Sequence, residues 1–480
     1  MSKHRTSIIT PLVIACALFM EQLDGSIIAT ALPTISRSLH TDPLHLNLAI
    51  TSYMFSLAIF IPLSGWVADR LGARAIFRAA IVVFMLGSVA CGFSDSLLTL
   101  VLSRSLQGLG GAMMVPVGRL VLLRSIPRSQ LVDAMAWVTA PALIGPVMGP
   151  PLGGFIVTYA SWRWIFFVNI PIGLLGLVMA TIFIDDIKGR SREPLDKLGF
   201  GFMALSLAGL VFGFETVGRH LLPTEAVVAC ITSGVICFAL YLWHVRHVDH
   251  PIVDLSLLKY PTYRASILGG SLTRIGIGAL PFLLPLMLQY GFGLTPAASG
   301  FITFASAAGS ILMKICATPI IRALGFRPIL VFDALINTVF LAGCALFVPE
   351  TPHSVIFIFL LLGGFFRSLQ FTALNTIAFA EIPQALISRA NTFYNMMQQL
   401  TLSLGVATGA LMLNLSLGWH HETFLTAHDF WPAYLGVGIM SLLSALSFIP
   451  LPKHAGAELS GHAQPVHAVP AKESELKDPI

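Results

Sequence analysis

The feature that most restricts the fold is a series of long apolar stretches that recurs along almost the whole chain of 480 residues. Each stretch is about 18 to 25 residues long, which as a helix is enough to cross a hydrocarbon core of about 30 Å. Only 11% of the residues are charged, whereas soluble proteins have roughly a quarter. Backbone groups within lipid must form hydrogen bonds inside their own helix. The sequence therefore predicts an all-α polytopic membrane protein.

Fourteen such stretches are expected to span the membrane, and this even number places both chain ends on one side. The first stretch is too long for a cleaved signal peptide and no small-residue cleavage pattern follows it, so we expect it to remain as a span. The predicted spans lie near residues 8–32, 46–65, 76–93, 97–118, 134–157, 164–184, 198–214, 226–243, 265–289, 297–321, 329–348, 354–379, 390–414 and 432–450.

Lysine and arginine gather in alternate loops between these spans. If the chain ends lie in the cytoplasm, the cytoplasmic segments hold most of the basic residues, Lys188 and Arg190 among them. The opposite loops then hold only Arg37, Arg163 and Arg219. Loops rich in Lys and Arg stay in the cytoplasm, so both termini are predicted to be cytoplasmic. The net charge of +5 therefore has a topological cause and does not indicate a nucleic-acid partner.

The chain contains an internal repeat, because three short patterns recur in the same order at offsets of 253 to 263 residues. The pairs are "LGAR" at 71–74 and "LGFR" at 324–327, "RSLQ" at 104–107 and 367–370, and Gly145 with Gly149 matched by Gly405 with Gly409. This repeat predicts two related six-helix halves. Such halves around a cavity at the membrane midplane are the architecture of many secondary transporters.

We therefore divide the chain into four parts. Residues 1–185 are predicted to form a first six-helix bundle, and residues 265–452 a second one. Residues 186–264 form a linker with two extra transmembrane helices. Residues 453–480 are polar and rich in Pro, Ala and His, so we expect a disordered cytoplasmic tail.

The segment "GWVADRLGAR", residues 65–74, joins the second and third spans. Glycine permits a tight turn and a close approach of helices, and an acid can pair with arginine or cap a helix. The order of Gly65, Asp69, Arg70, Gly72 and Arg74 resembles the signature of the major facilitator superfamily. The resemblance implies that Asp69, Arg70 and Arg74 form a cytoplasmic latch between helices.

Further stretches extend this resemblance over nearly the whole chain. They are "LDGSIIATALP" at 23–33, "LSRSLQGLGGA" at 102–112, "GPVMGPPLGG" at 145–154 and "SWRWIFFVNIPIG" at 161–173. Together they look like the drug:proton antiporter branch with fourteen transmembrane helices, and in particular a bacterial multidrug-resistance-type transporter. The resemblance implies the major facilitator fold, with two six-helix bundles plus two additional transmembrane helices.

The fifth predicted span is rich in glycine and proline. Gly145, Gly149 and Gly153 are spaced by four, so they share one helix face, and small residues on a face let helices pack closely. Ordinary tight packing is therefore one role of this helix. In the family, a helix of this type, here with Gly145, Pro146, Gly149, Gly153 and Gly154, is typical of exporters, so the resemblance favours efflux.

Glu21 and Asp24 lie three residues apart in the first span, so both can face the bundle interior. Burial and a like-charged neighbour favour the protonated form of a carboxyl group, and acids within a membrane often mark proton pathways. Asp24 and Arg104 lie about eight and about seven residues below the outer ends of their spans, a similar depth at 1.5 Å per residue. An ion pair is therefore feasible, with protonation of Asp24 releasing Arg104. A purely structural ion pair is the alternative. Asp24 occupies the acid position of the family signature, and Glu21 lies outside it.

Three basic residues, Arg274, Lys314 and Arg367, lie inside second-half spans, and we expect no acid in those spans. A basic side chain near a helix end can instead extend to the headgroups, which is the alternative for Lys314. Desolvated basic groups favour an anion, and arginine pairs with a carboxylate through two hydrogen bonds. An exporter of one anionic metabolite, such as an organic acid, therefore remains an alternative.

Several other chemistries have no support in the sequence. There is no G-x-x-x-x-G-K-[ST] phosphate loop, so the chain itself is not an ATP-driven pump. No Ser/His/Asp or Cys/His set emerges, and the six cysteines form neither a zinc pattern nor a disulfide framework. His244, His247 and His250 are regularly spaced but lie in a predicted loop before Pro251, so no metal is expected. A membrane sensor or an integral-membrane enzyme is therefore disfavoured.

We predict a proton-coupled multidrug efflux antiporter that works by alternating access in the bacterial cytoplasmic (inner) membrane. Its energy source would be the proton gradient rather than a cofactor, and its partners would be protons, lipid and a small-molecule substrate. We expect a monomer. The candidates for the substrate cavity between the halves are Gln107, Arg274, Gln289, Lys314, Arg367, Asn375, Tyr394, Asn395 and Gln398.

Overall fold

The computed structural model describes residues 3–125, 131–184, 195–216, 223–248, 251–383, 386–420, 425–452 and 455–456. Nearly all of the predicted tail lies outside these ranges, as do Lys188, Arg190 and Arg219. Every regular element within the described ranges is a helix, which agrees with the predicted all-α class.

The helices form three groups along the chain. The first bundle contains α1 Lys3–Ile27, η1 Ile28–Ala31, α2 Leu32–Ser38, η2 Pro43–Leu46, α3 Asn47–Leu71, α4 Ala73–Gly92, α5 Leu97–Ser125, α6 Leu131–Tyr159, α7 Trp164–Phe167 and α8 Asn169–Phe183. The linker contains α9 Lys197–Thr216, α10 Thr224–Val245 and η4 Leu255–Lys259. The second bundle contains α11 Pro261–Gly278, α12 Leu280–Leu286, η5 Met287–Gly291, α13 Pro296–Leu324, α14 Phe326–Gly343, η6 Cys344–Leu346, α15 His353–Ile377, α16 Ile387–His420, η8 Ala427–Asp429 and α17 Phe430–Phe448.

Twelve of the described helical stretches are long and apolar enough to cross a membrane, judged by length and composition. The predicted spans 97–118 and 134–157 are not among these twelve. Helices α5 and α6, each 29 residues long, nevertheless cover both of them. The twelve are counted over the described residues only. The count of fourteen is therefore not confirmed and stays a prediction.

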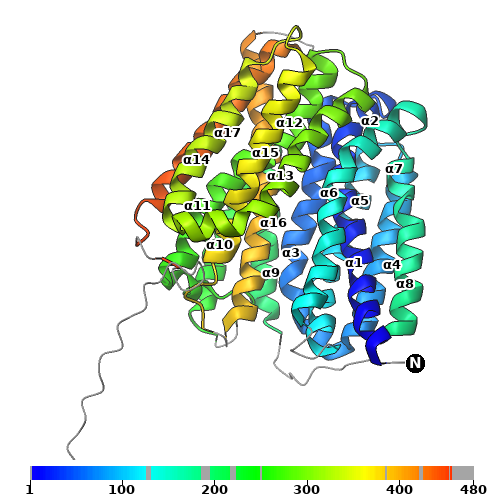
Figure 1. The fold of residues 1–480 in the computed structure, drawn as a ribbon, viewed down its shortest axis with the longest axis vertical. Coiled ribbons are helices and arrows are strands. Elements are labelled where there is room, and N and C mark those ends of the chain that lie inside the picture. The colour runs from blue at the N-terminus through cyan, green and yellow to red at the C-terminus, as the bar shows by residue number, and fades with distance from the viewer. Residues whose placement is uncertain are drawn as a thin grey trace, which may run out of the picture.

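Figure 1 shows α1 to α8 gathered on one side of the molecule and α11 to α17 on the other. The two bundles meet along two pairs of helices, α6 with α13 and α3 with α16. In the linker α9 packs along α10, and it also touches both α3 and α16. We call the end at which α1 begins the N-terminal end, and the end with α2 and α12 the opposite end (Figure 1).

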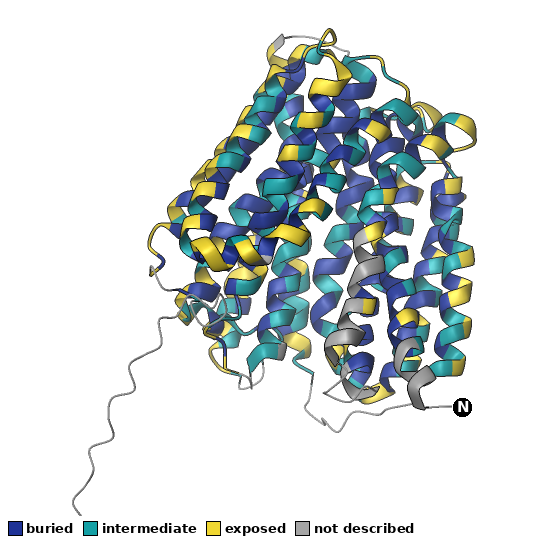
Figure 2. Ribbon diagram, in the orientation of Figure 1, coloured by how far each residue is buried: buried dark blue, intermediate teal, exposed yellow. Residues whose placement is uncertain are grey.

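The bundles share one continuous apolar core at the opposite end. There Ile28 and Leu32 of the first bundle belong to the same buried cluster as Phe282 and Leu286 of the second. Two further clusters each stay within a single bundle. Figure 2 shows buried positions mainly where helices face one another and exposed positions on the outward faces. Large apolar side chains such as Trp243 are exposed there, as lipid contact requires.

The repeated "LGxR" pattern forms the same local structure in both bundles. Gly72 follows α3 with a φ of 95°, and Gly325 follows α13 with a φ of 77°. A positive φ is readily adopted only by glycine, which ends helices in this way. Arg74 donates a hydrogen bond to a main-chain carbonyl near the end of α8, and Arg327 donates one to a carbonyl directly after α17. Each arginine thus ties the helix after the glycine to the last helix of its bundle.

Candidate proton and substrate site

A buried ion pair lies inside the first bundle. Asp24 on α1 and Arg104 on α5 are both fully buried, and Asp24 Oδ2 lies 2.6 Å from Arg104 Nη1. Asp24 Oδ1 accepts two more hydrogen bonds, from Gln107 Nε2 at 2.8 Å and from Asn169 Nδ2 at 2.7 Å. Three donors from α5 and α8 thus meet at this one carboxylate. The ion pair expected from similar depths is therefore present, while its role in proton coupling stays a prediction.

Ser88 on α4 completes this network. Its Oγ accepts hydrogen bonds from Gln107 Nε2 at 2.6 Å and from Asn169 Nδ2 at 3.0 Å. The close approach of α4 to α5 requires glycine, because a Cβ on Gly87 would lie 2.6 Å from Gln107 Cα. Sequence reasoning missed Ser88 and Asn169. Each is one small polar residue in an apolar run, and only the fold brings the two runs to Asp24.

Arg104 also makes contacts that do not depend on Asp24. Its Nε donates to Ala49 O at 2.9 Å, and its Nη1 donates to Gln107 Oε1 at 2.7 Å. The guanidinium carbon lies 4.3 Å from the centre of the Tyr53 ring, within the range of a cation–π interaction. Protonation of Asp24 would remove the charge compensation and leave Arg104 held in place. The site can therefore change its net charge without first changing its shape.

Glu21 lies one helical turn from Asp24 and has fewer partners. It is 7% exposed, and its Oε2 accepts no hydrogen bond. The positive charge of Arg119 on α5 acts on Glu21, and Arg119 Nη1 lies 3.5 Å from Asn391 Oδ1 on α16 of the second bundle. Gly25, one turn from Glu21 on the same face, borders open space, since a Cβ there would meet nothing within 4 Å. Glu21 therefore lies where the first bundle faces the second.

The predicted latch lies at the N-terminal end of the first bundle, where α3 ends and α4 begins. Its residues are Gly65, Asp69, Arg70, Gly72 and Arg74. The Arg70 guanidinium carbon lies 5.2 Å from the centre of the Trp66 ring. The main-chain carbonyl that Arg74 binds belongs to α8. Both contacts stay within the first bundle, and a role of this segment in switching between states stays a prediction.

The glycine-rich helix α6 uses two faces. Gly145, Gly149 and Gly153 face α1, where an added Cβ would lie 2.9, 2.0 and 2.5 Å from atoms of α1. The shared face inferred from the spacing of four is therefore present. Gly154 points toward the second bundle, since its Cβ would lie 2.4 Å from Pro296 O on α13. One helix thus packs tightly within its own bundle and against the other bundle.

Arg274 on α11 is fully buried, and no carboxylate of the described chain forms a salt bridge with it. Its Nη2 donates to Tyr394 Oη, and its guanidinium carbon lies 4.7 Å from the centre of the Tyr394 ring. Its Nε and Nη1 have no hydrogen-bond partner. Burial of unpaired donors of a charged group is costly. Arg274 is therefore a strong candidate for attracting an anion.

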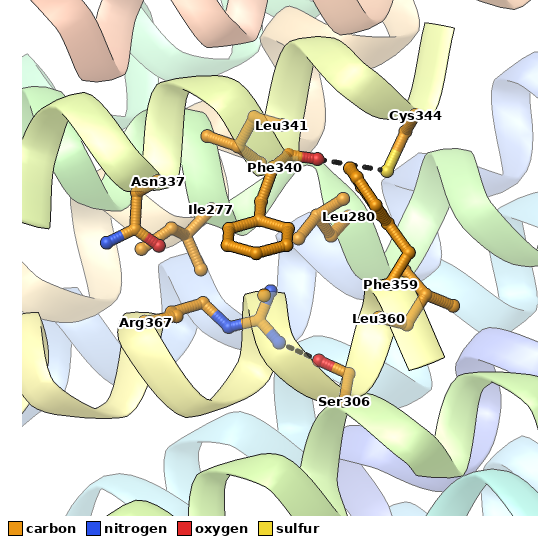
Figure 3. Close-up of a pocket in the computed structure, with 11 residues that line it drawn as sticks. Ile277, Leu280, Ser306, Asn337, Phe340, Leu341, Cys344, Phe359, Leu360 and Arg367 are labelled. Carbon is orange, nitrogen blue, oxygen red and sulfur yellow. Dashed lines mark hydrogen bonds between the residues drawn. The ribbon is translucent and has the colours of Figure 1, made fainter. Parts of the chain in front are cut away.

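Arg367 on α15 borders a small cavity, which Figure 3 shows between the Arg367 guanidinium and the Phe340 ring. Its Nη2 donates to Ser306 Oγ on α13. The cavity volume is about 20 Å³, and a space of this size holds about one water molecule. This cavity is therefore too small to hold a substrate beside Arg367.

Lys314 is exposed, and its Nζ donates to Thr372 Oγ1 at 2.9 Å on the neighbouring helix α15.

The expectation that second-half spans contain no acid is wrong. Asp333 lies within α14 and is only 2% exposed. The available signal was a single aspartate in the apolar run "LVFDALIN", residues 330–337. An excess of basic residues in the second bundle remains, but it is smaller than the sequence count indicated.

The remaining cavity candidates lie in different places. Gln107 is buried in the network around Asp24. Gln289 is buried at the opposite end, where its Nε2 donates to Thr30 O of the first bundle at 2.9 Å. Gln289 therefore helps to join the two bundles, and its place in a substrate cavity stays a prediction. Three candidates are at least partly accessible, namely Asn375, Asn395 and Gln398.

No metal site emerges in the described ranges, where no group of three or more His, Cys, Asp or Glu residues is arranged to hold an ion. One of the regularly spaced histidines has another role. His244 Nε2 lies 2.7 Å from Asp196 Oδ1, which joins the end of α10 to the start of α9.

The chain matches known proteins over most of its length. The family described as Major Facilitator Superfamily matches residues 14–262 and 266–480. The chain is 37% identical over 449 residues to a protein of Enterobacter sp. (strain 638) and 38% identical over 445 residues to one of Pectobacterium carotovorum subsp. carotovorum (strain PC1). Both are named "Putative multidrug resistance protein MdtD", and the matches cover 92% of this chain and 94% and 95% of those relatives.

Two solved structures have a similar fold. The D-xylose-proton symporter matches with a TM-score of 0.67 at 16% identity, covering 93% of this chain and 98% of that one. The inward-open xylose transporter XylE from E. coli matches with a TM-score of 0.62 at 13% identity, covering 95% and 99%. At these identities the likeness concerns the fold alone.

Proposed function

Because this chain belongs to the major facilitator superfamily and is a multi-pass membrane transporter, we propose that it exports small amphipathic or toxic compounds in exchange for protons. Two bundles around a central site allow alternating access, in which the bundles rock around bound substrate. The name of the relatives, which refers to multidrug resistance, supports a broad range of substrates.

The observation that carries proton coupling is the contrast between Asp24 and Glu21. The Asp24 carboxylate is held by three donors, including its ion pair with Arg104. Glu21 faces the second bundle with one oxygen free of hydrogen bonds. A proton that reaches Asp24 cancels its charge and leaves Arg104 uncompensated. After protonation the site carries one more positive charge and no longer attracts a cationic substrate. Binding of the proton and binding of the substrate therefore oppose each other, as antiport requires.

We further propose that the structure represents an inward-facing state. The opposite end is closed by the shared apolar core, by Gln289, and by a hydrogen bond from Ala297 N of α13 to Thr158 Oγ1 of α6 at 3.0 Å. The positive-inside rule assigns the N-terminal end to the cytoplasm. In the inner membrane of a bacterium, the closed end would then face the periplasm.

Purified protein in liposomes tests this proposal. An acidic lumen should drive uptake of a cationic dye by molecules oriented with the cytoplasmic side outward, and dye entry should release protons from the lumen. Liposomes without protein provide the control for leakage. Dye uptake that is equally fast without a pH gradient would contradict antiport, and absence of uptake for every dye tested would contradict multidrug export.

A second function, export of an organic anion, is favoured by one observation. Arg274 keeps two unpaired nitrogen atoms, Nε and Nη1, in a fully buried position. Charge-assisted hydrogen bonds from arginine to carboxylates are strong, so an anionic metabolite would supply an acceptor that these nitrogen atoms lack. The same liposomes, supplied with labelled organic acids in place of dyes, distinguish the two functions.

A further inference from the structure

The buried acid on α14 has no role in the proposed cycle. Asp333 is the eighth residue of α14, about 10 Å along the helix axis from its start. It is 2% exposed, and neither of its carboxyl oxygens accepts a hydrogen bond. It differs in this from Asp24, whose carboxylate has three donors.

Within the described part of the chain, no salt bridge involves this carboxyl group. Its surroundings include a cluster of apolar residues on α13, α14, α15 and α17. Three basic residues of the neighbouring helices donate to other groups, Arg367 to Ser306, Lys314 to Thr372 and Arg274 to Tyr394. The others, Arg264, Arg322 and His353, lie in the first or last turn of their helices. An ionised carboxylate in such a place would be strongly destabilised.

Gln370 on α15 contacts α14 one helical turn before Asp333. It is fully buried, its Nε2 donates to Leu330 O at 3.3 Å, and its Oε1 has no hydrogen-bond partner. Two neighbouring helices therefore carry a buried acid without partners and a buried amide oxygen that lacks a donor. A protonated Asp333 supplies the O–H group that Gln370 Oε1 needs.

The internal repeat strengthens this pairing. Gln370 ends the second "RSLQ" pattern and corresponds to Gln107, which ends the first. Gln107 Nε2 donates to Asp24. Each bundle thus has the glutamine of the repeat beside a buried acid. The acids come from different helices, α1 and α14, and only Asp24 has donors that stabilise its charge.

We propose that Asp333 and Gln370 form a second proton-binding site, in the second bundle, and that it holds a proton in the state described here. The bound proton forms a hydrogen bond between α14 and α15. Its release requires water or a basic group to reach the carboxylate, so it is coupled to separation of these two helices. This site goes beyond the proposed function, because it exists whether or not protons drive transport.

Infrared difference spectroscopy of the purified full-length protein tests the site directly. At neutral pH the spectrum of the wild type minus that of Asp333→Asn should contain the carbonyl band of a protonated carboxylic acid. The Asn side chain has the same shape, stays neutral and can donate to Gln370, so the variant should fold. The matched control Asp24→Asn should instead remove bands of an ionised carboxylate. Bands of an ionised carboxylate in the Asp333 difference spectrum would overturn the proposal.

A second variant keeps the test decisive if Asp333→Asn does not fold. Gln370→Leu removes only the acceptor, so the acid carbonyl band should shift to higher frequency as its hydrogen bond is lost. An unchanged band position would overturn the pairing with Gln370. Both measurements are made without substrate or a proton gradient, so their outcome is independent of whether liposome transport succeeds.

Discussion

Asp24 and Glu21 show how strongly local surroundings separate two like side chains on one helix. Asp24 is fully buried and accepts hydrogen bonds from Arg104, Gln107 and Asn169. Glu21, three residues earlier, keeps one oxygen without a hydrogen bond and lies near Arg119. The first carboxylate is fixed in place by three donors, whereas one oxygen of the second has no hydrogen-bond partner.

We expect Asp24→Asn to abolish proton-driven transport, while Glu21→Gln only weakens it. Removal of the Asp24 charge leaves Arg104 permanently uncompensated, so proton binding can no longer change the charge of the site. A loss of at least about tenfold, corresponding to ~1.4 kcal/mol, is expected for Asp24→Asn in the liposome assay. Thermal unfolding of both variants serves as the control for folding. Full proton-driven flux in Asp24→Asn would refute the assignment.

Sequence reasoning found the ion pair but only part of its surroundings. The similar depth of Asp24 and Arg104 follows from residue counting along two helices, which needs no knowledge of packing. Asn169 and Ser88 escaped notice because α8 and α4 each contribute one polar residue. Asp333 escaped notice because its neighbours in sequence are apolar. Its importance comes from the absence of donors, and only the packed structure reveals that absence.

At the level of elements, the glycine face of α6 was predictable and its second contact was not. A spacing of four places three glycines on one face of any helix, whatever that face meets. The contact of Gly154 with Pro296 depends on how two bundles dock. Gly300 on α13 makes the reciprocal contact, since its Cβ would lie 2.2 Å from Pro150 O.

Gly154→Ala should therefore disturb closure of the opposite end. The added Cβ would meet main-chain atoms of α13, and overpacking of this kind costs about 1–3 kcal/mol. Spin labels at Ser38 and His428 should report a longer or broader distance between the bundles in the variant. Gly201→Ala is the matched control, because a Cβ at Gly201 meets nothing within 4 Å. Equal distance distributions in the two variants would contradict the role of Gly154.

The last turn of α3 gives a different prediction. Asp69→Asn should slow transport without loss of substrate binding, because a latch changes the balance between states and need not touch the ligand. Substrate affinity in detergent and flux in liposomes are measured on the same preparation. Lost affinity in a folded variant would mean that Asp69 contributes to the substrate site itself.

At the scale of the whole molecule, the sequence was most informative about architecture. The "LGxR" pattern recurs with matching geometry in the two bundles. In each bundle the glycine ends one helix, and the arginine ties the next helix to the last helix of that bundle. The predicted number of fourteen spans is not confirmed, since twelve helical stretches of the described residues are long and apolar enough to cross a membrane. The docking of the two bundles has no counterpart in any local pattern.

Substrate charge is also decided at this scale. If the protein exports a broad range of drugs, Arg367→Ala should leave export of a cationic dye within about twofold of the wild type, since Arg367 adjoins only water-sized space in its cavity. Arg274→Ala serves as the partner variant in the same assay. Transport of an organic acid that is lost in Arg274→Ala, together with no transport of any cationic dye, would instead establish an anion exporter.

The apolar core that the two bundles share at the opposite end holds that end closed in the state described here. To open that end, contacts such as those of Ile28 and Leu32 with Phe282 must be broken, at a cost of about 25 cal/mol for each Å² of apolar surface exposed. A transporter that visits both states needs a comparable seal at the N-terminal end. Helix α9 of the linker touches α3 and α16, and Ala58, Met203 and Phe393 of these three helices share one buried cluster. When the bundles rock, α9 must therefore either move with one bundle or lose part of this apolar contact.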